Sequence, residues 1–135
     1  TDYNIKIDAT YLSGSTSQSG YGICSRATDS SKISGYCFQF DPGAGNKFLV
    51  RTWSDGKENM KSIASVDMKS VLGSSFNLNA THSIEIEVIG AQQVIKVDGV
   101  QVLKFSDSTF TKGSVGVRTW NNTKAEFSEA TVTNR

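Results

Sequence analysis

The chain has 135 residues and a formal net charge of +1, from 14 Lys and Arg residues against 13 Asp and Glu residues. This near balance excludes the basic surface that attracts nucleic acid or an anionic membrane, and no apolar run approaches the roughly 20 residues of a membrane-spanning helix. Val (11) and Ile (9) outnumber Leu (5), which favours β-sheet over helical packing. Length and composition therefore predict one all-β domain that covers residues 1–135.

The first half of the chain is predicted to form four strands joined by polar turns. Apolar and polar residues alternate from Tyr3 to Ala9, which is typical of a strand with one buried face. The polar stretch at 13–20 is interpreted as a surface loop. Three further strands form an antiparallel meander and are expected at about 21–27, 35–41 and 47–53, separated by turn sequences at 28–31 and 41–46.

The second half contains a stretch without a clean period and then further strands. Between residues 55 and 80 we expect irregular structure with at most one short helical turn. Alternation returns from His82, and Gly90-Ala91-Gln92 and Asp98-Gly99 are expected to turn successive hairpins. Strands at about 113–120 and 124–133 complete some eight strands, which predicts a two-sheet antiparallel sandwich. Its predicted core holds Ile5, Ile7, Ile23, Phe38, Phe40, Val50, Ile84, Ile86, Val115, Val117 and Phe127.

Cys24 and Cys37 are the only cysteines in the chain. They face each other if the hairpin between the strands at 21–27 and 35–41 is centred between Ser30 and Ser31. A directly opposed, non-hydrogen-bonded pair has Cα atoms roughly 4.5 Å apart, which a disulfide tolerates. We predict this cross-strand disulfide, as in an exported protein, with two buried reduced thiols as the alternative. Two cysteines and the lone His82 are too few for a zinc site, so we expect no metal site, and such a histidine usually lies at the surface or in a turn.

Glycines, aromatic residues and arginines recur at ordered positions in two parts of the chain. The first part reads Gly20-Tyr21-Gly22-Ile23-Cys24-Ser25-Arg26, then Ser34-Gly35-Tyr36-Cys37-Phe38-Gln39-Phe40-Asp41-Pro42-Gly43, then Phe48-Leu49-Val50-Arg51. The second reads Val97-Asp98-Gly99-Val100, then Gly113-Ser114-Val115-Gly116-Val117-Arg118-Thr119-Trp120, then Ala125-Glu126-Phe127. They resemble the central and the closing strands of concanavalin A-like, or laminin G-like, jelly-roll domains. The resemblance spans most of residues 3–133 and implies a jelly-roll sandwich.

Within that group, the segment 35–43 with Phe48 and Arg51 looks most similar to the C-terminal domain of Firmicutes prepilin-type (type IV pilin-like) surface proteins. Those proteins carry such a sandwich behind an N-terminal pilin helix. The likeness implies an extracellular or cell-surface domain whose partners are a glycan or another host or cell-surface ligand, or the subunits of a pilin-like filament. The chain starts directly on a strand, so we expect that a helix or opening strand of the precursor is absent and that this fragment makes no membrane contact.

The hairpin face that carries the cysteines is the predicted ligand face. Parity places Arg26 and Gln39 on this face, opposite the apolar core face, and the resembled jelly rolls have a concave outer face lined by polar and aromatic side chains. The tetrapeptide Val-Arg-Thr-Trp occurs at 50–53 and at 117–120, and the resemblance places these strands in one sheet. An arginine beside an indole suits sugar hydroxyls or a carboxylate, whereas a cation–π pair that merely covers the sheet is the alternative. The ligand-binding candidates are Arg26, Gln39, Arg51, Trp53, Arg118 and Trp120.

Three functions remain open at this point. The first is a non-enzymatic pilin-like or adhesin head that binds carbohydrate on the concave face. The second is a hydrolase of glycosides or keto-disaccharides, which needs two carboxylates about 5–5.5 or 6.5–9.5 Å apart. Glu85 and Glu87 stand roughly 6.5–7 Å apart along one strand, but such a pair is also ordinary on an exposed sheet face. The third is structural packing in a filament without a small ligand. No cofactor is expected, and although loop carboxylates hold Ca²⁺ in many such sandwiches, no spacing here specifies a calcium site.

Overall fold

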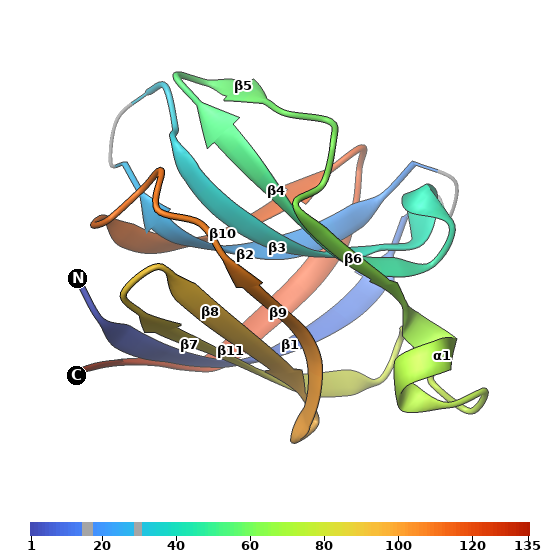
Figure 1. Ribbon diagram of the computed structural model, residues 1–135. Coiled ribbons are helices and arrows are strands. Elements are labelled where there is room, and N and C mark those ends of the chain that lie inside the picture. Colours follow the sequence, from blue (N-terminus) through green and yellow to red (C-terminus); the bar gives the residue numbers. More distant parts are fainter. Residues whose placement is uncertain (15–17, 29–30) are drawn as a thin grey trace.

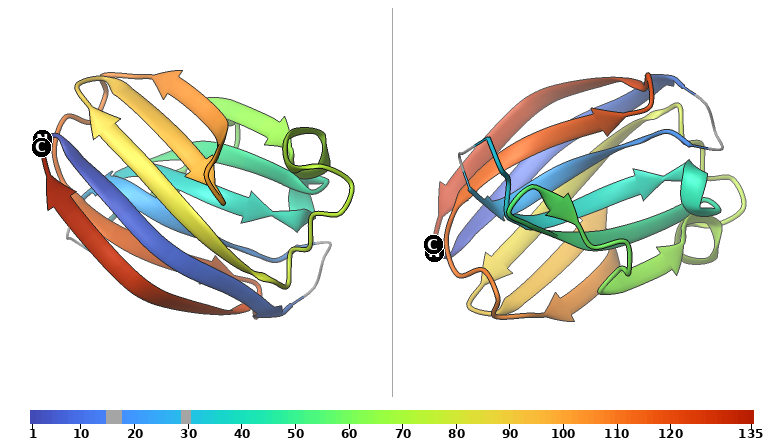
Figure 2. Two further views of the ribbon diagram at one scale, coloured as in Figure 1. Left: turned by 90° about the horizontal axis from the view of Figure 1, so that it is seen from below. Right: turned by 90° about the horizontal axis from the view of Figure 1, so that it is seen from above.

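The computed structural model describes residues 1–14, 18–28 and 31–135. In it, two antiparallel sheets stack against each other (Figures 1 and 2). The strand order is β11-β1-β7-β8-β9 in one sheet and β10-β2-β3-β4-β5 in the other, where β6 also pairs with β4. The predicted all-β, two-sheet antiparallel sandwich is confirmed. The first sheet comprises β1 (Tyr3–Ser13), β7 (Thr81–Ile89), β8 (Gln92–Val97), β9 (Val100–Ser106) and β11 (Lys124–Asn134). The second comprises β2 (Gly20–Ala27), β3 (Gly35–Asp41), β4 (Lys47–Ser54), β5 (Lys57–Glu58), β6 (Ala64–Asp67) and β10 (Ser114–Trp120).

The core lies between the inner faces of the two sheets. On the five-stranded sheet, Ile86 pairs with Ile5 of β1 and with Ile95 of β8, which forms an apolar row across three strands. Rings from the other sheet meet this row, and the centroids of Tyr21 and Phe40 lie 4.6 Å apart in a stacked arrangement. Most of the predicted core is confirmed: Ile5, Ile7, Ile23, Phe38, Phe40, Val50, Ile84 and Ile86 are buried, and Val115 and Phe127 are partly buried against them.

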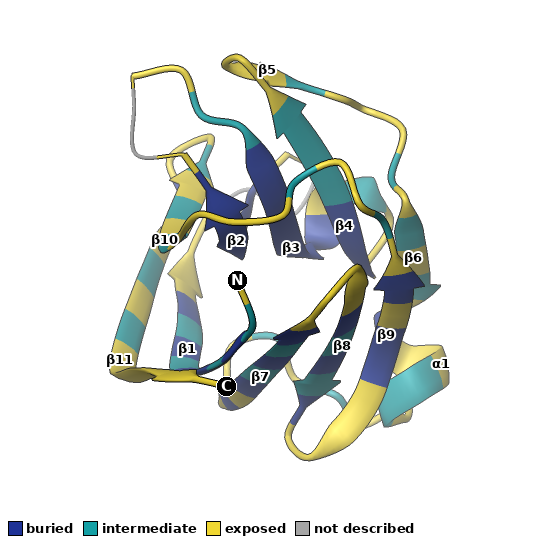
Figure 3. Ribbon diagram, turned by 60° about the vertical axis from the view of Figure 1, so that its left-hand side comes forward, coloured by how far each residue is buried: buried dark blue, intermediate teal, exposed yellow. Residues whose placement is uncertain are grey.

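Val117 is the predicted core residue that the structure contradicts, because its side chain is 48% exposed. It pairs with the buried Ile23 and therefore shares the inner face of the sheet. However, β10 is an edge strand with a neighbour on one side only, and β11 is the corresponding edge of the other sheet. Figure 3 shows exposed positions along both strands, in contrast to the continuous burial of β2 and β3. The alternation of side chains along the strand therefore predicted the correct face for Val117 but not how deeply it is buried.

The stretch between residues 55 and 80 contains short elements that simple periodicity does not predict. Positive φ values of 51° at Asp55 and 82° at Gly56 form the turn between β4 and β5. The expected helical turn is present as α1 (Met68–Leu72), and Asp67 caps it by accepting from the backbone N–H groups of Lys69 and Ser70.

A 3₁₀ turn, η1 (Pro42–Ala44), connects β3 to β4. Residues 15–17 of the predicted loop and 29–30 of the predicted turn lie outside the described residues.

Candidate functional site

The outer face of the six-stranded sheet contains a trough because β2 presents glycines there. Gly22 pairs with Arg118 of β10 on one side and with Gln39 of β3 on the other. A Cβ atom at Gly22 would lie 2.7 Å from the Phe38 carbonyl oxygen, and one at Gly20 would overlap the indole of Trp120. Glycine is therefore required at both positions, and it lets side chains from the flanking strands lie across β2.

The two Val-Arg-Thr-Trp copies meet over this trough. The guanidinium carbon of Arg118 lies 4.9 Å from the ring centroid of Trp53 on β4 and 4.5 Å from that of Trp120 on its own strand. Arg118 thus contacts one indole from each copy, which is the cation–π arrangement that the sequence left open as an alternative. We call Trp53, Arg118 and Trp120 the Trp–Arg–Trp cluster. The structure places β10, β2, β3 and β4 in one sheet, as the resemblance implied.

Glu58 connects the polar residues of this face. Its Oε2 atom accepts hydrogen bonds from Arg118 Nη1 at 3.1 Å and from Gln39 Nε2 at 3.2 Å, and its Oε1 atom lies 3.8 Å from Arg51 Nη1. Sequence reasoning missed Glu58 because a two-residue strand is too short to show alternation. The signal that could have found it is the Asp55-Gly56 turn, since an Asp-Gly hairpin places Glu58 opposite Trp53, where the structure has it.

Asp41 is a second carboxylate on the same face. It is 4% exposed, its Oδ1 accepts from the Ala44 N–H at 3.0 Å, and its Oδ2 lies 3.9 Å from Arg51 Nη1. Burial raises the pKa of Asp41, and the nearby Arg51 guanidinium opposes part of that rise. The sequence placed Asp41 in a turn because of its backbone chemistry, and the structure adds that its carboxylate faces Arg51.

These residues surround a hollow of about 420 Å³ that we call the outer-face pocket. Three buried polar atoms on this face, Gln39 Oε1, Arg51 Nε and Trp53 Nε1, have no hydrogen-bond partner within the described chain. An unsatisfied buried polar atom is unfavourable, and two of these atoms, Gln39 Oε1 and Arg51 Nε, belong to residues that line the pocket. The pocket is lined by Gln18, Gln39, Asp41, Gly43, Ala44, Arg51, Glu58, Met60, Arg118, Trp120 and Asn121.

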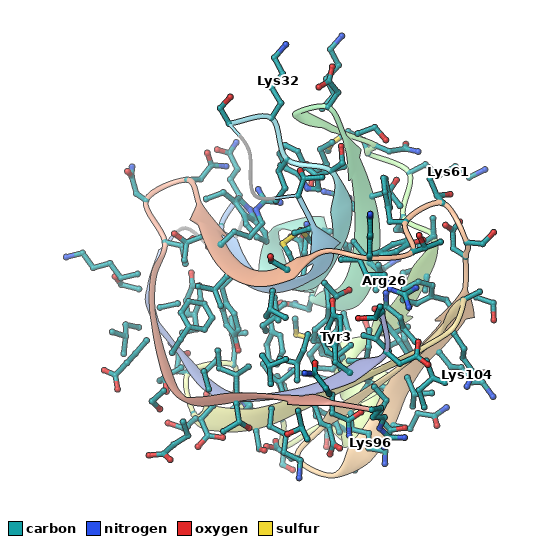
Figure 4. The ribbon with its side chains drawn as sticks, turned by 90° about the vertical axis from the view of Figure 1, so that its left-hand side faces the viewer. Tyr3, Arg26, Lys32, Lys61, Lys96 and Lys104 are labelled. Carbon is teal, nitrogen blue, oxygen red and sulfur yellow. A yellow bond between two sulfur atoms is a disulfide. The ribbon has the colours of Figure 1, made fainter. Side chains whose placement is uncertain are left out.

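Arg26 does not belong to this face, so its predicted placement there is wrong. The register between β10 and β2 shifts next to Arg26, whose φ is +46°, and this β-bulge breaks the parity that the prediction assumed. Its side chain is 3% exposed, donates to the carbonyl oxygens of Gly90 at 2.6 Å and Phe110 at 3.2 Å, and lies 3.5 Å from Asp2. Figure 4 shows Arg26 beside Tyr3, between the two sheets. Arg26 therefore ties the N-terminal segment to two loops.

The disulfide prediction is confirmed. Cys24 and Cys37 are paired across β2 and β3 and are bonded, with a Cα–Cα distance of 4.0 Å. The alternative of two reduced thiols is excluded. The bond lies on the outer face, where the partly buried Trp53 and Ile33 pack against it. It thus supports one indole of the Trp–Arg–Trp cluster.

The remaining titratable candidates lie elsewhere. Glu85 and Glu87 are on β7 of the other sheet, and Glu87 forms an ion pair with Lys96 at 3.5 Å. They are therefore not part of the outer-face pocket. His82 is buried and hydrogen-bonded to Asp98 instead of lying at the surface, as a lone histidine usually does. Within residues 1–14, 18–28 and 31–135, no group of three or more His, Cys, Asp or Glu side chains is placed to hold a metal ion.

Solved structures of similar fold include a carbohydrate-binding module and several galectins. The carbohydrate-binding module CBM66 from Bacillus subtilis is 22% identical over 99% of this chain and 76% of its own, with a TM-score of 0.80. The toad ovary galectin, in complex with N-acetylgalactose, is 13% identical over 96% of this chain and 88% of its own, with a TM-score of 0.67. Sheep galectin-11, in complex with glycerol, is 14% identical over 97% and 89%, with a TM-score of 0.66. These similarities confirm the jelly-roll, lectin-like fold.

No protein-family model matches the chain, and no curated protein is significantly similar to it. Among the helices in the described part of the chain, none has the length and apolar character needed to cross a membrane.

Proposed function

We propose that this chain is a non-catalytic carbohydrate-binding domain whose ligand occupies the outer-face pocket. The observation that carries the proposal is the convergence of two guanidinium groups, two carboxylates and the Gln39 amide on one hollow of about 420 Å³. That volume lies within the roughly 300–1,000 Å³ typical of ligand pockets. These groups come from β3, β4, β5 and β10, so the sheet itself fixes their spacing.

The chemistry of the pocket suits a neutral sugar. Each sugar hydroxyl both donates and accepts hydrogen bonds, and the pocket offers acceptors at Asp41 and Glu58 beside donors at Arg51 and Arg118. The two positive and two negative charges balance, so the pocket has no excess charge to attract an acidic sugar. The indole of Trp120 also lines the pocket and offers an apolar surface to the C–H face of a sugar ring.

The similar folds support this proposal. One is named a carbohydrate-binding module, and the toad galectin was solved with N-acetylgalactose. Of the six candidates from the sequence, Gln39, Arg51, Trp53, Arg118 and Trp120 are retained for ligand binding or for holding the pocket. Arg26 is not.

A hydrolase is the less supported alternative. Glu85 and Glu87 lie on the other sheet, and the carboxylates of the pocket itself are already paired. Glu58 accepts hydrogen bonds from Arg118 and Gln39, so its carboxylate already holds neighbouring side chains in place. Asp41 accepts from Ala44 and lies beside Arg51. We therefore expect no sugar release from glycosides or keto-disaccharides.

The setting that we propose is extracellular. A disulfide persists in oxidising surroundings, which supports an exported domain. We further propose that residues 1–135 form one jelly-roll domain that acts as a pilin-like or adhesin head at a cell surface. Packing into a filament without a ligand is the competing role, and it predicts no glycan binding.

The test compares two isosteric substitutions. A glycan array first identifies a ligand for the wild-type protein, and calorimetric titration then measures its affinity for Glu58→Gln and for the matched control Glu85→Gln on the other sheet. Glu58→Gln is expected to weaken binding about tenfold to a hundredfold, which corresponds to roughly 1.5–3 kcal/mol for hydrogen bonds to a charged group. Glu85→Gln should bind like the wild type. No glycan binding by the wild type, or equal affinities for both variants, would overturn the proposal.

A further inference from the structure

His82 is a buried titratable residue with no part in the outer-face pocket. It lies on β7, is 5% exposed, and faces two oxygen atoms. Its Nδ1 is 2.6 Å from Asp98 Oδ2, and its Nε2 is 2.7 Å from the carbonyl oxygen of Asn77. The carboxylate is itself held in place, because Asp98 Oδ1 accepts from the Ser83 N–H at 2.9 Å. Both ring nitrogens therefore contact hydrogen-bond acceptors.

A neutral imidazole satisfies only one of these contacts. It carries one N–H and one lone pair, so the lone pair would face an oxygen at 2.6 or 2.7 Å. The imidazolium donates from both nitrogens and satisfies both contacts. We infer that His82 carries two protons in this structure and that its second proton latches the segment 73–80 onto β7. This inference stands independently of the proposed sugar binding.

The surroundings of the ring are consistent with a charged form. Phe76 stacks on it with centroids 4.6 Å apart and an interplanar angle of 15°, and Phe40 lies 5.8 Å away. An aromatic face attracts a cation. The titratable groups that face His82 and its partner are Asp98, from the turn between β8 and β9, and Tyr21 of β2. Burial, with a further contribution from Asp98, raises the pKa of Tyr21, so Tyr21 is neutral.

The latch closes one side of a second hollow, of about 470 Å³. Asn77 belongs to the segment between α1 and β7, and Leu72, Phe76 and Val100 line the hollow. When His82 loses its second proton, one attractive contact becomes a repulsion between two acceptors. The latch is therefore present in the doubly protonated form of His82 and is lost when the second proton leaves. The expected result is a segment 73–80 that opens more readily at higher pH.

Two measurements on the whole chain test this inference. Long-range ¹H–¹⁵N NMR spectra report whether each ring nitrogen of His82 carries a proton. Hydrogen exchange, corrected for the intrinsic pH dependence of amide exchange, reports the protection of residues 73–80. Between about pH 5 and about pH 8, where imidazole side chains change charge, that protection is expected to fall roughly tenfold or more.

His82→Gln is the matched variant. A glutamine amide can donate to the Asn77 carbonyl oxygen at every pH in this range, so the protection of residues 73–80 should become insensitive to pH. The wild-type NMR measurement does not depend on how that variant folds. A singly protonated His82 ring throughout the range, or wild-type protection that does not change with pH, would overturn the inference.

Discussion

Removal of the disulfide should lower stability by an amount that the structure allows to be worked out. The bond joins Cys24 to Cys37 across 13 positions of sequence, and closing a loop of that length removes about 3 kcal/mol of chain entropy from the unfolded state. The hairpin already holds the two strands in register, which reduces this value, whereas loss of two buried sulfur atoms increases it. We therefore expect the double variant Cys24→Ala/Cys37→Ala to lose about 3 kcal/mol of unfolding free energy, which corresponds to a fall in Tm of roughly 10 °C.

Thermal unfolding followed by circular dichroism, with and without reductant, is the assay. Wild-type protein in reductant should approach the Tm of the double variant, and the variant itself should not respond to reductant. Thiol titration of denatured, unreduced wild type should find no reactive thiol. Two reactive thiols, or a wild-type Tm that reductant leaves unchanged, would refute the reasoning.

Three further predictions concern single side chains. Trp120→Ala should weaken glycan binding by roughly 1–3 kcal/mol in calorimetric titration, because it removes the aromatic wall of the pocket; unchanged affinity would limit Trp120 to covering the sheet. Tyr36→Phe should lower the free energy of unfolding by roughly 1–2 kcal/mol, because the Tyr36 hydroxyl donates to Asp107 Oδ1 at 2.5 Å and accepts from the Phe110 N–H at 3.2 Å; urea unfolding measures this. The hydrogen bond from Tyr36 is the main cause that lowers the pKa of Asp107 below its ordinary value of 3.8. The stability that this hydrogen bond contributes is therefore present above pH 3.8 and is lost as the pH falls below that value. Tyr36→Phe should accordingly lose less stability on acidification than the wild type does. Burial raises the pKa of Asp41 above 3.8. On acidification, glycan affinity should therefore begin to fall at a higher pH than it would if Asp41 had an ordinary carboxyl pKa. Asp41→Asn should remove that part of the pH profile.

Local patterns predicted much of the fold because they depend on short-range physical chemistry. The hairpin register that pairs Cys24 with Cys37 was correct since alternation on both strands and the turn between them agree. The turn at Asp98-Gly99 was correct because both residues adopt positive φ, 52° and 81°, which this dipeptide tolerates. Where neighbouring strands of a hairpin are regular, the sequence alone thus predicts which sheet face each side chain occupies and which residue it pairs with.

The errors arise where the pleat is interrupted or where distant strands meet. Arg26 lies at a bulge, and one extra residue in a strand reverses the face that parity assigns. Glu58 lies on a strand of two residues, which is too short for any period. Local patterns also could not show that β10 joins β2, so the contact between Trp53 and Arg118 depended on a resemblance of the whole domain. Long-range pairing is decided by packing of the complete sheet.

The most direct test of the account is to locate a bound glycan on the wild-type protein by NMR. A ligand identified on the array is titrated into ¹⁵N-labelled protein, and amide and side-chain shifts are followed to saturation. We expect the largest changes at residues around the outer-face pocket, namely Gln39, Arg51, Glu58, Arg118 and Trp120. Saturable changes confined to the outer face of the other sheet, around Glu85 and Lys96, would contradict it.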